Sequence, residues 1–260
     1  MRTIDATRRD RVRIRDIWPG SPAPSGTLPP GQRLINLFPR YGTHLSRPIP
    51  DVSQLRVIQV SGALTRPVDI PIADLASMPR REMRADFHCV AGWSVRGLRW
   101  AGVPFHTLYE SLIEPVARPG VSHLLFAGVD GFWAVLTLED ALNDDVIVAD
   151  QLDGRPLSDQ HGGPARLVSP SQYGYKSTKH LSAIELHTAE PPEGHVDMMI
   201  NLGLRLVKPH PRARVATEER HRYLPPWAVR WLNFNLIHPV IGYLSALRNV
   251  TDARSAGHRD

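Results

Sequence analysis

The chain has 260 residues, of which 42% are hydrophobic and 22% are charged, and its formal net charge is +5. These values are typical of a globular protein with a buried core, and they exclude a largely disordered chain and a polytopic membrane protein. A single cysteine, Cys89, excludes an internal disulfide, a cysteine-rich zinc site and an iron–sulfur cluster held by this chain alone.

The N-terminal region carries a twin arginine, Arg8 and Arg9, which superficially resembles an export signal. No apolar stretch of the kind that signal peptides need follows it, and no apolar run is long enough to span a bilayer. We therefore expect a cytoplasmic protein by default, with any membrane association made through a partner. Residues 1–33 are basic and then proline-rich, which predicts an extended arm.

A compact domain is expected over residues 34–190. A short helix is predicted over Ile72–Met78, ended by Pro79, and a second helix begins at Pro104 and carries Leu108 and Leu112. Apolar runs bounded by turn residues predict strands over 54–61, 84–90, 121–127, 132–138, 146–150, 165–169 and 183–187. Of these, 121–127 and 132–138 form a hairpin, and Asp153-Gly154 marks another tight turn. Short strands with few, short helices indicate an α+β fold of mixed sheets rather than a doubly wound α/β fold.

Residues 191–260 form a C-terminal extension of different character. The stretch from Arg205 to Arg230 contains seven basic residues and only two acidic ones, Glu218 and Glu219. Residues 231–247 carry no formal charge. This second stretch is too short and too interrupted by polar residues and proline to span a bilayer. Two interpretations remain: a tail packed on the main domain, or a docking surface over 205–247 for a redox partner.

Two segments concentrate chemically useful residues. Cys89 stands at a strand end before Gly92, Trp93 and Ser94, where its thiolate is a soft metal ligand, although a lone cysteine is more often a small buried hydrophobe. The segment Gln160–Lys179 combines Arg166, two of the chain's three lysines, hydroxyls and glycines. Read alone, it fits a cradle for an anionic ligand and a solvated basic face equally well.

Several familiar motifs are missing. The chain has no G-x-G-x-x-G, H-E-x-x-H or C-x-x-C-H pattern, and Tyr175 interrupts the only resemblance to a phosphate-binding P-loop. His88 is adjacent to Cys89, but neighbours on a strand point to opposite faces, so we expect His88 to have a structural role rather than to pair with the thiol.

Taken together, the two segments resemble the molybdopterin-binding domain of the sulfite oxidase family. The resemblance covers residues 34–190 and is closest to the family's compact bacterial catalytic subunits related to a methionine-sulfoxide reductase. It rests on the order and separation of two groups of residues. The first group is Cys89, Trp93, Trp100, Gly102 and Pro104, and the second is His161, Pro164, Arg166, Pro170, Tyr173, Lys176 and Lys179. It implies molybdenum and one molybdopterin, a mono-pyranopterin, as cofactors.

The resemblance also implies roles for individual residues. Cys89 matches the family's metal ligand. The family's substrate-site residues do not carry over to this chain; Arg96 is a candidate for binding an oxyanion substrate because it follows Cys89 closely, and Tyr173 is a candidate hydrogen-bond donor near the metal. The implied cofactor contacts are Asp130, His161, Arg166, Lys176, Ser177, Thr178 and Lys179. An upstream Arg-Asn-His-like turn of the family is replaced here by residues 38–44 without the Asn, which leaves Arg40, Tyr41 and His44 as candidates.

The implied activity is oxygen-atom transfer by a molybdenum-dependent oxidoreductase on a small oxyanion, S-oxide or N-oxide. Because the chain shows no haem, flavin or iron–sulfur motif, electrons must be exchanged with a separate redox partner protein, for which a membrane haem protein is one candidate. Two alternatives stay open: a cofactor-binding protein without turnover, and a basic nucleic-acid-binding module. The second has charge but no recognised motif, so we expect no specific nucleic acid partner.

Overall fold

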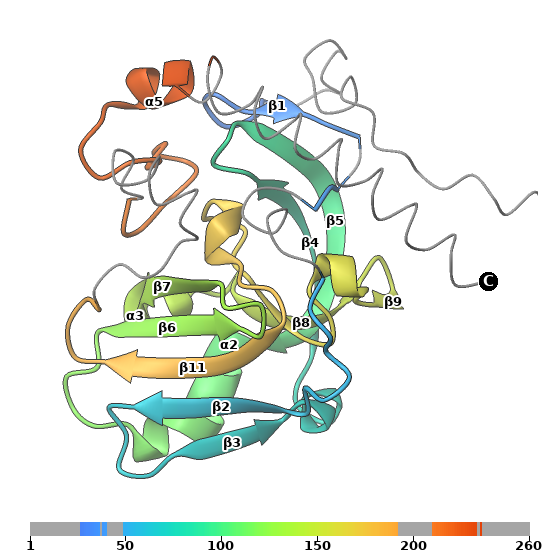
Figure 1. Ribbon diagram of the computed structural model, residues 1–260, viewed down its shortest axis with the longest axis vertical. Coiled ribbons are helices and arrows are strands. Elements are labelled where there is room, and N and C mark those ends of the chain that lie inside the picture. Colours follow the sequence, from blue (N-terminus) through green and yellow to red (C-terminus); the bar gives the residue numbers. More distant parts are fainter. Residues whose placement is uncertain (1–26, 37, 41–48, 192–209, 233–234, 236–260) are drawn as a thin grey trace, which may run out of the picture.

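The computed structural model describes residues 27–36, 38–40, 49–191, 210–232 and 235. Two β-sheets and several short helical segments make up this part of the chain (Figure 1). The strands are β1 (Arg33–Leu34), β2 (Val57–Gly62), β3 (Val68–Pro71), β4 (Arg81–His88), β5 (Trp93–Pro104), β6 (His123–Gly128), β7 (Trp133–Thr137), β8 (Ile147–Leu152), β9 (Arg155–Pro156), β10 (Arg166–Val168) and β11 (Leu181–His187).

The helical segments are short. The α-helices are α2 (Phe105–Leu108), α3 (Leu138–Ala141) and α5 (Pro226–Leu232). The others are single turns of 3₁₀ or π geometry: η2 (Ile72–Ala76), η3 (Tyr109–Ile113), η4 (Glu114–Val116), η5 (Asp159–His161) and η6 (Gly174–Lys176). Few, short helices beside mixed sheets confirm the predicted α+β class.

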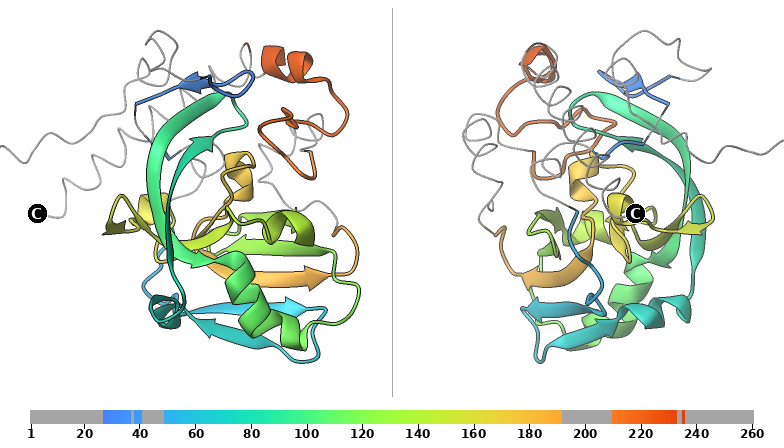
Figure 2. Two further views of the ribbon diagram at one scale, coloured as in Figure 1. Left: turned by 180° about the vertical axis from the view of Figure 1, so that it is seen from behind. Right: turned by 45° about the vertical axis from the view of Figure 1, so that its right-hand side comes forward.

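Among the described residues, one sheet has six strands and the other has five. The first runs in the order β1-β5-β8-β10, with β4 paired to β5 and β9 paired to β8. The second runs in the order β3-β2-β11-β6-β7. Most neighbours are antiparallel, while β1 with β5 and β2 with β11 are parallel. Figure 2 shows from two sides how the long, curved β5 and β4 extend beyond the five-stranded sheet towards β1 and α5.

The start of strand β8 lies between the two main hydrophobic clusters, which explains why residues 146–149 are continuously apolar. The later part of the strand contains the polar Asp150 and Gln151. Val148 packs in the cluster beneath the five-stranded sheet, and its neighbours Ile147 and Ala149 pack in the cluster around Trp93 and Trp100. Successive side chains on a strand point to opposite faces, so a strand buried on both faces needs an uninterrupted apolar run. Residues 146–149 are accordingly completely buried.

The predicted strands all have counterparts in the structure, with ends shifted by a few residues, and the predicted hairpin is β6 with β7. The helix expected over 72–78 is the shorter turn η2, and Pro104 is the residue before α2 rather than its first residue. The sequence did not predict the strands β1, β3, β5 and β9. Strand β5 escaped notice because Arg96, Gly97 and Arg99 interrupt its apolar pattern, yet it pairs with β1, β4 and β8.

The described part of the C-terminal extension packs on the segment that follows β10. Tyr173 donates its backbone N–H to the carbonyl of Ala213 (2.9 Å), and Val215 donates to the carbonyl of Ser171 (3.0 Å). The side chains of Tyr173, Ala213 and Val215 form a third, small hydrophobic cluster. No helix among the described residues is both long enough and apolar enough to cross a bilayer.

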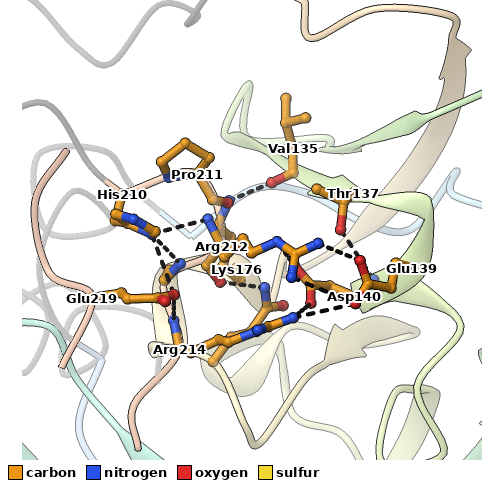
Figure 3. A network of polar contacts seen from close by, with 12 residues as sticks. Val135, Thr137, Glu139, Asp140, Lys176, His210, Pro211, Arg212, Arg214 and Glu219 are labelled. Atoms are coloured by element: carbon orange, nitrogen blue, oxygen red, sulfur yellow. Dashed lines mark hydrogen bonds and ion pairs between the residues drawn. The ribbon is translucent and has the colours of Figure 1, made fainter. Parts of the chain in front are cut away.

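A charged network reinforces this packing (Figure 3). Arg214 binds the buried carboxylate of Asp140 in α3 at 2.8 Å, and Arg212 binds the neighbouring Glu139. Lys176 donates hydrogen bonds to the carbonyl oxygens of Val135 and Pro211, the second at 2.6 Å. Residues 210–214 are therefore tied to both β7 and α3.

Candidate functional site

Cys89 lies in the tight turn between β4 and β5. Its backbone N–H donates to the carbonyl of Trp93 (2.8 Å), and its own carbonyl accepts from the N–H of Gly92 (2.9 Å). The side chain is partly buried against the cluster that contains Phe87 and Trp100. Burial raises the pKa of the Cys89 thiol to about 12, whereas the backbone at Ala91 and the charge of Arg220 lower it. A thiolate here needs a cation or a metal beside it.

A chain of polar groups supports the Cys89 turn. Gln32 donates from Nε2 to the Cys89 carbonyl (3.1 Å), and its Oε1 accepts a hydrogen bond from Ser94 Oγ (2.9 Å). Ser94 Oγ also lies 2.8 Å from His88 Nδ1. All three supporting side chains are buried, so the network is shielded from water. His88 thus bonds to Ser94, which agrees with the structural role predicted for it.

Arg166 is the buried centre of the second segment. Only 1% of the residue is exposed, and its guanidinium donates to the carbonyls of His161 (2.8 Å) and Ser177 (3.0 Å). It also lies over the rings of Trp100 and Phe87, at 5.2 and 5.9 Å from their centroids. Burial lowers the pKa of Arg166 to about 9. A buried cation is stabilised when an anion binds next to it.

His161 and Lys179 lie beside this arginine. The His161 ring stacks on Phe38 with a centroid distance of 4.9 Å, and its buried Nδ1 has no hydrogen-bond partner among the described residues. Burial, with Lys179 and Arg166 as further causes, lowers the pKa of His161 to about 4. Lys179 is 7% exposed and donates a hydrogen bond to the Gln160 carbonyl (2.8 Å). Burial and the charges of Arg166 and Arg40 lower the pKa of Lys179, whereas the charge of Asp130 raises it.

Gly162 brings Lys179 into this position. Its backbone has a φ of +97°, and a Cβ added there would lie 2.8 Å from the Cβ of Lys179. Only glycine combines this left-handed conformation with so close an approach. The turn therefore sets the lysine side chain against the backbone that follows His161. The result is a buried cradle of basic side chains in which, as far as the structure describes the chain, one imidazole nitrogen lacks a hydrogen-bond partner. Such a cradle fits an anionic group that carries hydrogen-bond donors and acceptors.

Aromatic rings connect the cradle to Cys89. Phe38 contacts both His161 and Phe87, and the Phe38 and Phe87 ring centroids are 4.8 Å apart. Phe87 lies two residues before Cys89 and stacks on Trp93, which follows the turn. The two segments that the sequence singled out, about 70 residues apart, therefore share one wall of aromatic side chains.

The remaining predicted residues have varied surroundings. Ser177 accepts a hydrogen bond from the N–H of Ser169 (3.1 Å), and Thr178 donates to the carbonyl of Phe126 (3.1 Å). Asp130 accepts from the N–H of Phe132 (3.1 Å) in the turn between β6 and β7. Arg96 is 3.8 Å from Asp86 on the neighbouring strand.

Four other predicted residues need separate mention. Tyr173 is completely buried, and burial raises the pKa of its hydroxyl to about 12, with Arg220 and Gln32 acting in the opposite direction. Lys176 holds the C-terminal segment, as described above, through the carbonyls of Val135 and Pro211. Tyr41 and His44 lie outside the described residues.

Sequence reasoning missed two residues that contact the Cys89 turn. Gln32 belongs to the segment expected to be an extended arm, and no local pattern distinguishes it. Arg220 lies in the C-terminal extension, is 2% exposed, and donates to the carbonyl of Val90 next to Cys89. The only signal for it was the short Glu218-Glu219-Arg220 sequence, in which acidic residues interrupt a basic stretch.

Comparisons with known proteins identify the family of the chain. Residues 44–195 match the model of the oxidoreductase molybdopterin binding domain. The chain is 30% identical over 168 residues to the uncharacterized oxidoreductase YuiH of Bacillus subtilis (strain 168), covering 65% of this chain and 83% of YuiH. It is also 30% identical over 150 residues to the protein-methionine-sulfoxide reductase catalytic subunit MsrP of Gluconobacter oxydans (strain 621H), covering 52% of this chain and 48% of that protein.

The chain is also similar to a solved structure. The sulfane dehydrogenase SoxCD from Paracoccus pantotrophus superimposes with a TM-score of 0.49 at 23% identity, over 54% of this chain and 40% of that one. The family match covers more than half of the chain and contains both Cys89 and the His161–Lys179 cradle. The chain therefore belongs to the oxidoreductase molybdopterin-binding domain family, the sulfite oxidase family, and is an oxidoreductase of that family.

Proposed function

We propose that the protein catalyses oxygen-atom transfer at a molybdenum centre ligated by the Cys89 thiolate. The observation that carries the proposal is the buried cradle of His161, Arg166 and Lys179, in which the His161 Nδ1 has no hydrogen-bond partner within the described part of the chain, and which shares an aromatic wall with Cys89. A phosphate-bearing mono-pyranopterin has the charge and the hydrogen-bonding groups that such a cradle lacks. Sulfur is the soft donor that molybdenum would need from the protein.

In this proposal the protein supplies position and charge. Lys179 and Arg166 offset the negative charge of the cofactor, and His161 offers Nδ1 to it. Asp130 raises the pKa of Lys179 and so favours its protonated, charged form. Gln32 and the backbone of the turn orient Cys89. When bound, the molybdenum centre supplies the two-electron change that accompanies oxygen-atom transfer, while protein groups tune it. Arg96 and Tyr173 remain the proposed substrate-binding and hydrogen-bonding residues of this site.

The substrate class that we propose is an S-oxide, because the relative MsrP is named for methionine sulfoxide reduction. An N-oxide and a small oxyanion are the alternatives to compare in the same assay. A separate redox partner protein exchanges the electrons. The described segment 210–232 offers exposed rings for docking it, since Tyr223, Trp227 and Trp231 are 70%, 68% and 61% exposed.

The test is metal and pterin analysis of the protein produced in a host that makes the cofactor. We expect about one molybdenum and one pyranopterin per chain, together with turnover of an S-oxide using a small artificial electron donor. Cys89→Ser should abolish turnover and change the visible absorption of the metal centre, because it removes a soft, covalent donor at nearly constant volume. Purified protein that holds only zinc, or a Cys89→Ser variant with wild-type turnover, would contradict the proposal.

A further inference from the structure

Arg220 joins three separate parts of the chain at the Cys89 turn. Its Nη1 donates to the carbonyl of Val90, and its Nη2 donates to the carbonyls of Pro30 and Gly31, both at 3.1 Å. These partners lie 130, 190 and 189 residues away in sequence. A planar guanidinium with five donors can hold several carbonyl groups at once, which the single ammonium of lysine does less well.

The arginine is itself fixed from the other side. Its Nε donates to Glu218 Oε1 at 3.2 Å, and Glu218 Oε2 accepts from Arg230 Nη1 at 2.6 Å. The guanidinium carbon lies 4.9 Å from the centroid of the buried Tyr173 ring. Bonds to charged groups in a buried place are stronger and better oriented than exposed ones. Arg220 therefore has little freedom to leave the Cys89 turn.

The backbone of Gly31 is shaped to this cluster. Its φ is +65°, and a Cβ added there would lie 2.6 Å from Arg230 Cδ and 2.9 Å from both Arg220 Nη2 and Glu218 Oε1. The three side chains thus pack directly over Gly31. One carboxylate stands against two guanidinium groups in this cluster, so an excess positive charge remains beside the turn that carries the sulfur.

We propose that Arg220 is a positioning residue for Cys89, contributed by the C-terminal extension, and that it locks residues 29–33 and the turn 89–92 into one unit. The inference rests on the proposed function in so far as Cys89 is the metal ligand. The locking itself needs no metal. Residue 220 is thereby part of the cofactor site, although it lies outside residues 44–195, over which the family model matches.

Hydrogen exchange of the full-length protein, followed by mass spectrometry, tests the proposal together with molybdenum content. The informative amides are those of Arg33, which donates to Gly92, and of Cys89, which donates to Trp93. In Arg220→Gln both should exchange about tenfold faster or more, because a hydrogen bond to a charged group is worth about that factor. Molybdenum per chain should fall as well.

Arg214→Gln is the matched control. It removes another arginine of the same segment, one that binds Asp140 rather than the Cys89 turn. It should leave exchange at Arg33 and Cys89 and the molybdenum content at wild-type values. Arg220→Lys keeps the charge but loses the fork, so it should resemble Arg220→Gln. Wild-type exchange at both amides in Arg220→Gln or in Arg220→Lys would overturn the positioning role.

If Arg220→Gln does not fold, Glu218→Gln takes its place, since it weakens the contact that orients Arg220 and leaves the side-chain shape unchanged. It should speed exchange of the same two amides, and unchanged exchange there would overturn the inference. The two proposals fail separately. If Arg220→Gln exchanges faster but the wild-type protein holds no molybdenum, only the proposed metal site is refuted. If the wild-type protein holds its full molybdenum but Arg220→Gln exchanges at the wild-type rate, only the role of Arg220 is refuted.

Discussion

At the level of single residues, the site holds titratable groups under conditions that disfavour their charged forms. His161 illustrates this, because burial and two neighbouring cations lower its pKa to about 4. Lys179 and Arg166 show the same direction for their own pKa values, with burial as the first cause. Burying several cations together costs stability in the cofactor-free protein. A bound anion would remove much of this cost, which couples cofactor binding to stability.

A prediction at the scale of single residues concerns the pH dependence of stability. Because the folded pKa of His161 lies below its ordinary value of 6.5, the unfolded chain binds the proton first. The contribution to stability is complete above about pH 6.5 and is lost as pH falls towards 4. For the cofactor-free protein, His161 should reduce the free energy of unfolding by about 1–2 kcal/mol between pH 7 and pH 5, given about 1.4 kcal/mol per pKa unit.

Urea unfolding of the wild type and of His161→Gln at pH 7 and pH 5 measures this effect. The variant should lose less stability than the wild type on acidification. Some dependence will persist, since burial also lowers the pKa of His88 and that of His180. Equal losses in the two proteins would show that the His161 ring is already solvated in the folded state.

At the level of elements, the segment from Gln160 to Lys179 serves two purposes. Its first part and its last residue form the cradle around Arg166. The part around η6 instead fastens the C-terminal extension, through Tyr173, Lys176 and the backbone of Ser171. Two lysines that lie three residues apart in sequence therefore bind different partners: Lys176, at the end of η6, binds the carbonyl of Pro211, and Lys179 binds that of Gln160.

Lys176→Met and Lys179→Met form a matched pair that tests this division. Lys176→Met removes the donor from two carbonyl groups, so it should lower the free energy of unfolding by about 2 kcal/mol or more. Folded protein of that variant should keep its molybdenum. Lys179→Met removes a buried charge with one carbonyl partner, so it should cost less stability yet lose most of the cofactor.

Thermal melting and metal analysis of both variants give the readouts. The two effects should separate, with stability lost in one variant and cofactor lost in the other. Similar molybdenum content in both variants would mean that Lys179 is as structural as Lys176, and would weaken the assignment of the cradle.

At the level of the whole molecule, segments from both ends of the described chain meet at the Cys89 turn. From the N-terminal side, strand β1 pairs with the start of β5. From the C-terminal side, Ala213 and Val215 pack against Tyr173, and Arg220 donates to the carbonyl of Val90. The sequence left two interpretations of the C-terminal extension, a packed tail and a docking surface. Its described residues include both buried members, such as Val215 and Arg220, and exposed rings, such as Trp227 and Trp231.

Truncation after Pro192 separates these contributions. Removing Val215 and Arg220 exposes the ring of Tyr173 and releases the Cys89 turn, so the truncated protein should melt at a lower temperature and lose molybdenum. The control is Trp227→Ser with Trp231→Ser, which removes exposed rings and should keep both wild-type stability and metal. A truncated protein that stays folded, metal-loaded and active with an artificial donor would assign the extension to docking alone.

The sequence by itself determined the fold class and the two segments of the site. Strands such as β8 are visible because burial on two faces requires a continuous apolar run, and the β6–β7 hairpin is visible because its turn has glycine and aspartate at the bend. Cys89 and the cluster from His161 to Lys179 are visible because rare residue types, one cysteine and two of three lysines, gather in short stretches.

Only the tertiary structure decided which cations gather in the candidate cradle and which hold the backbone. The carbonyl partners of Lys176 and Arg220 lie 35 or more residues away, and no local pattern records a contact over that separation. Strand β5 was hidden for a related reason, since charged residues and a glycine break its pattern where neighbouring strands provide the pairing. Long-range hydrogen bonds are properties of the folded chain, and they assign Gln32 and Arg220 to the site.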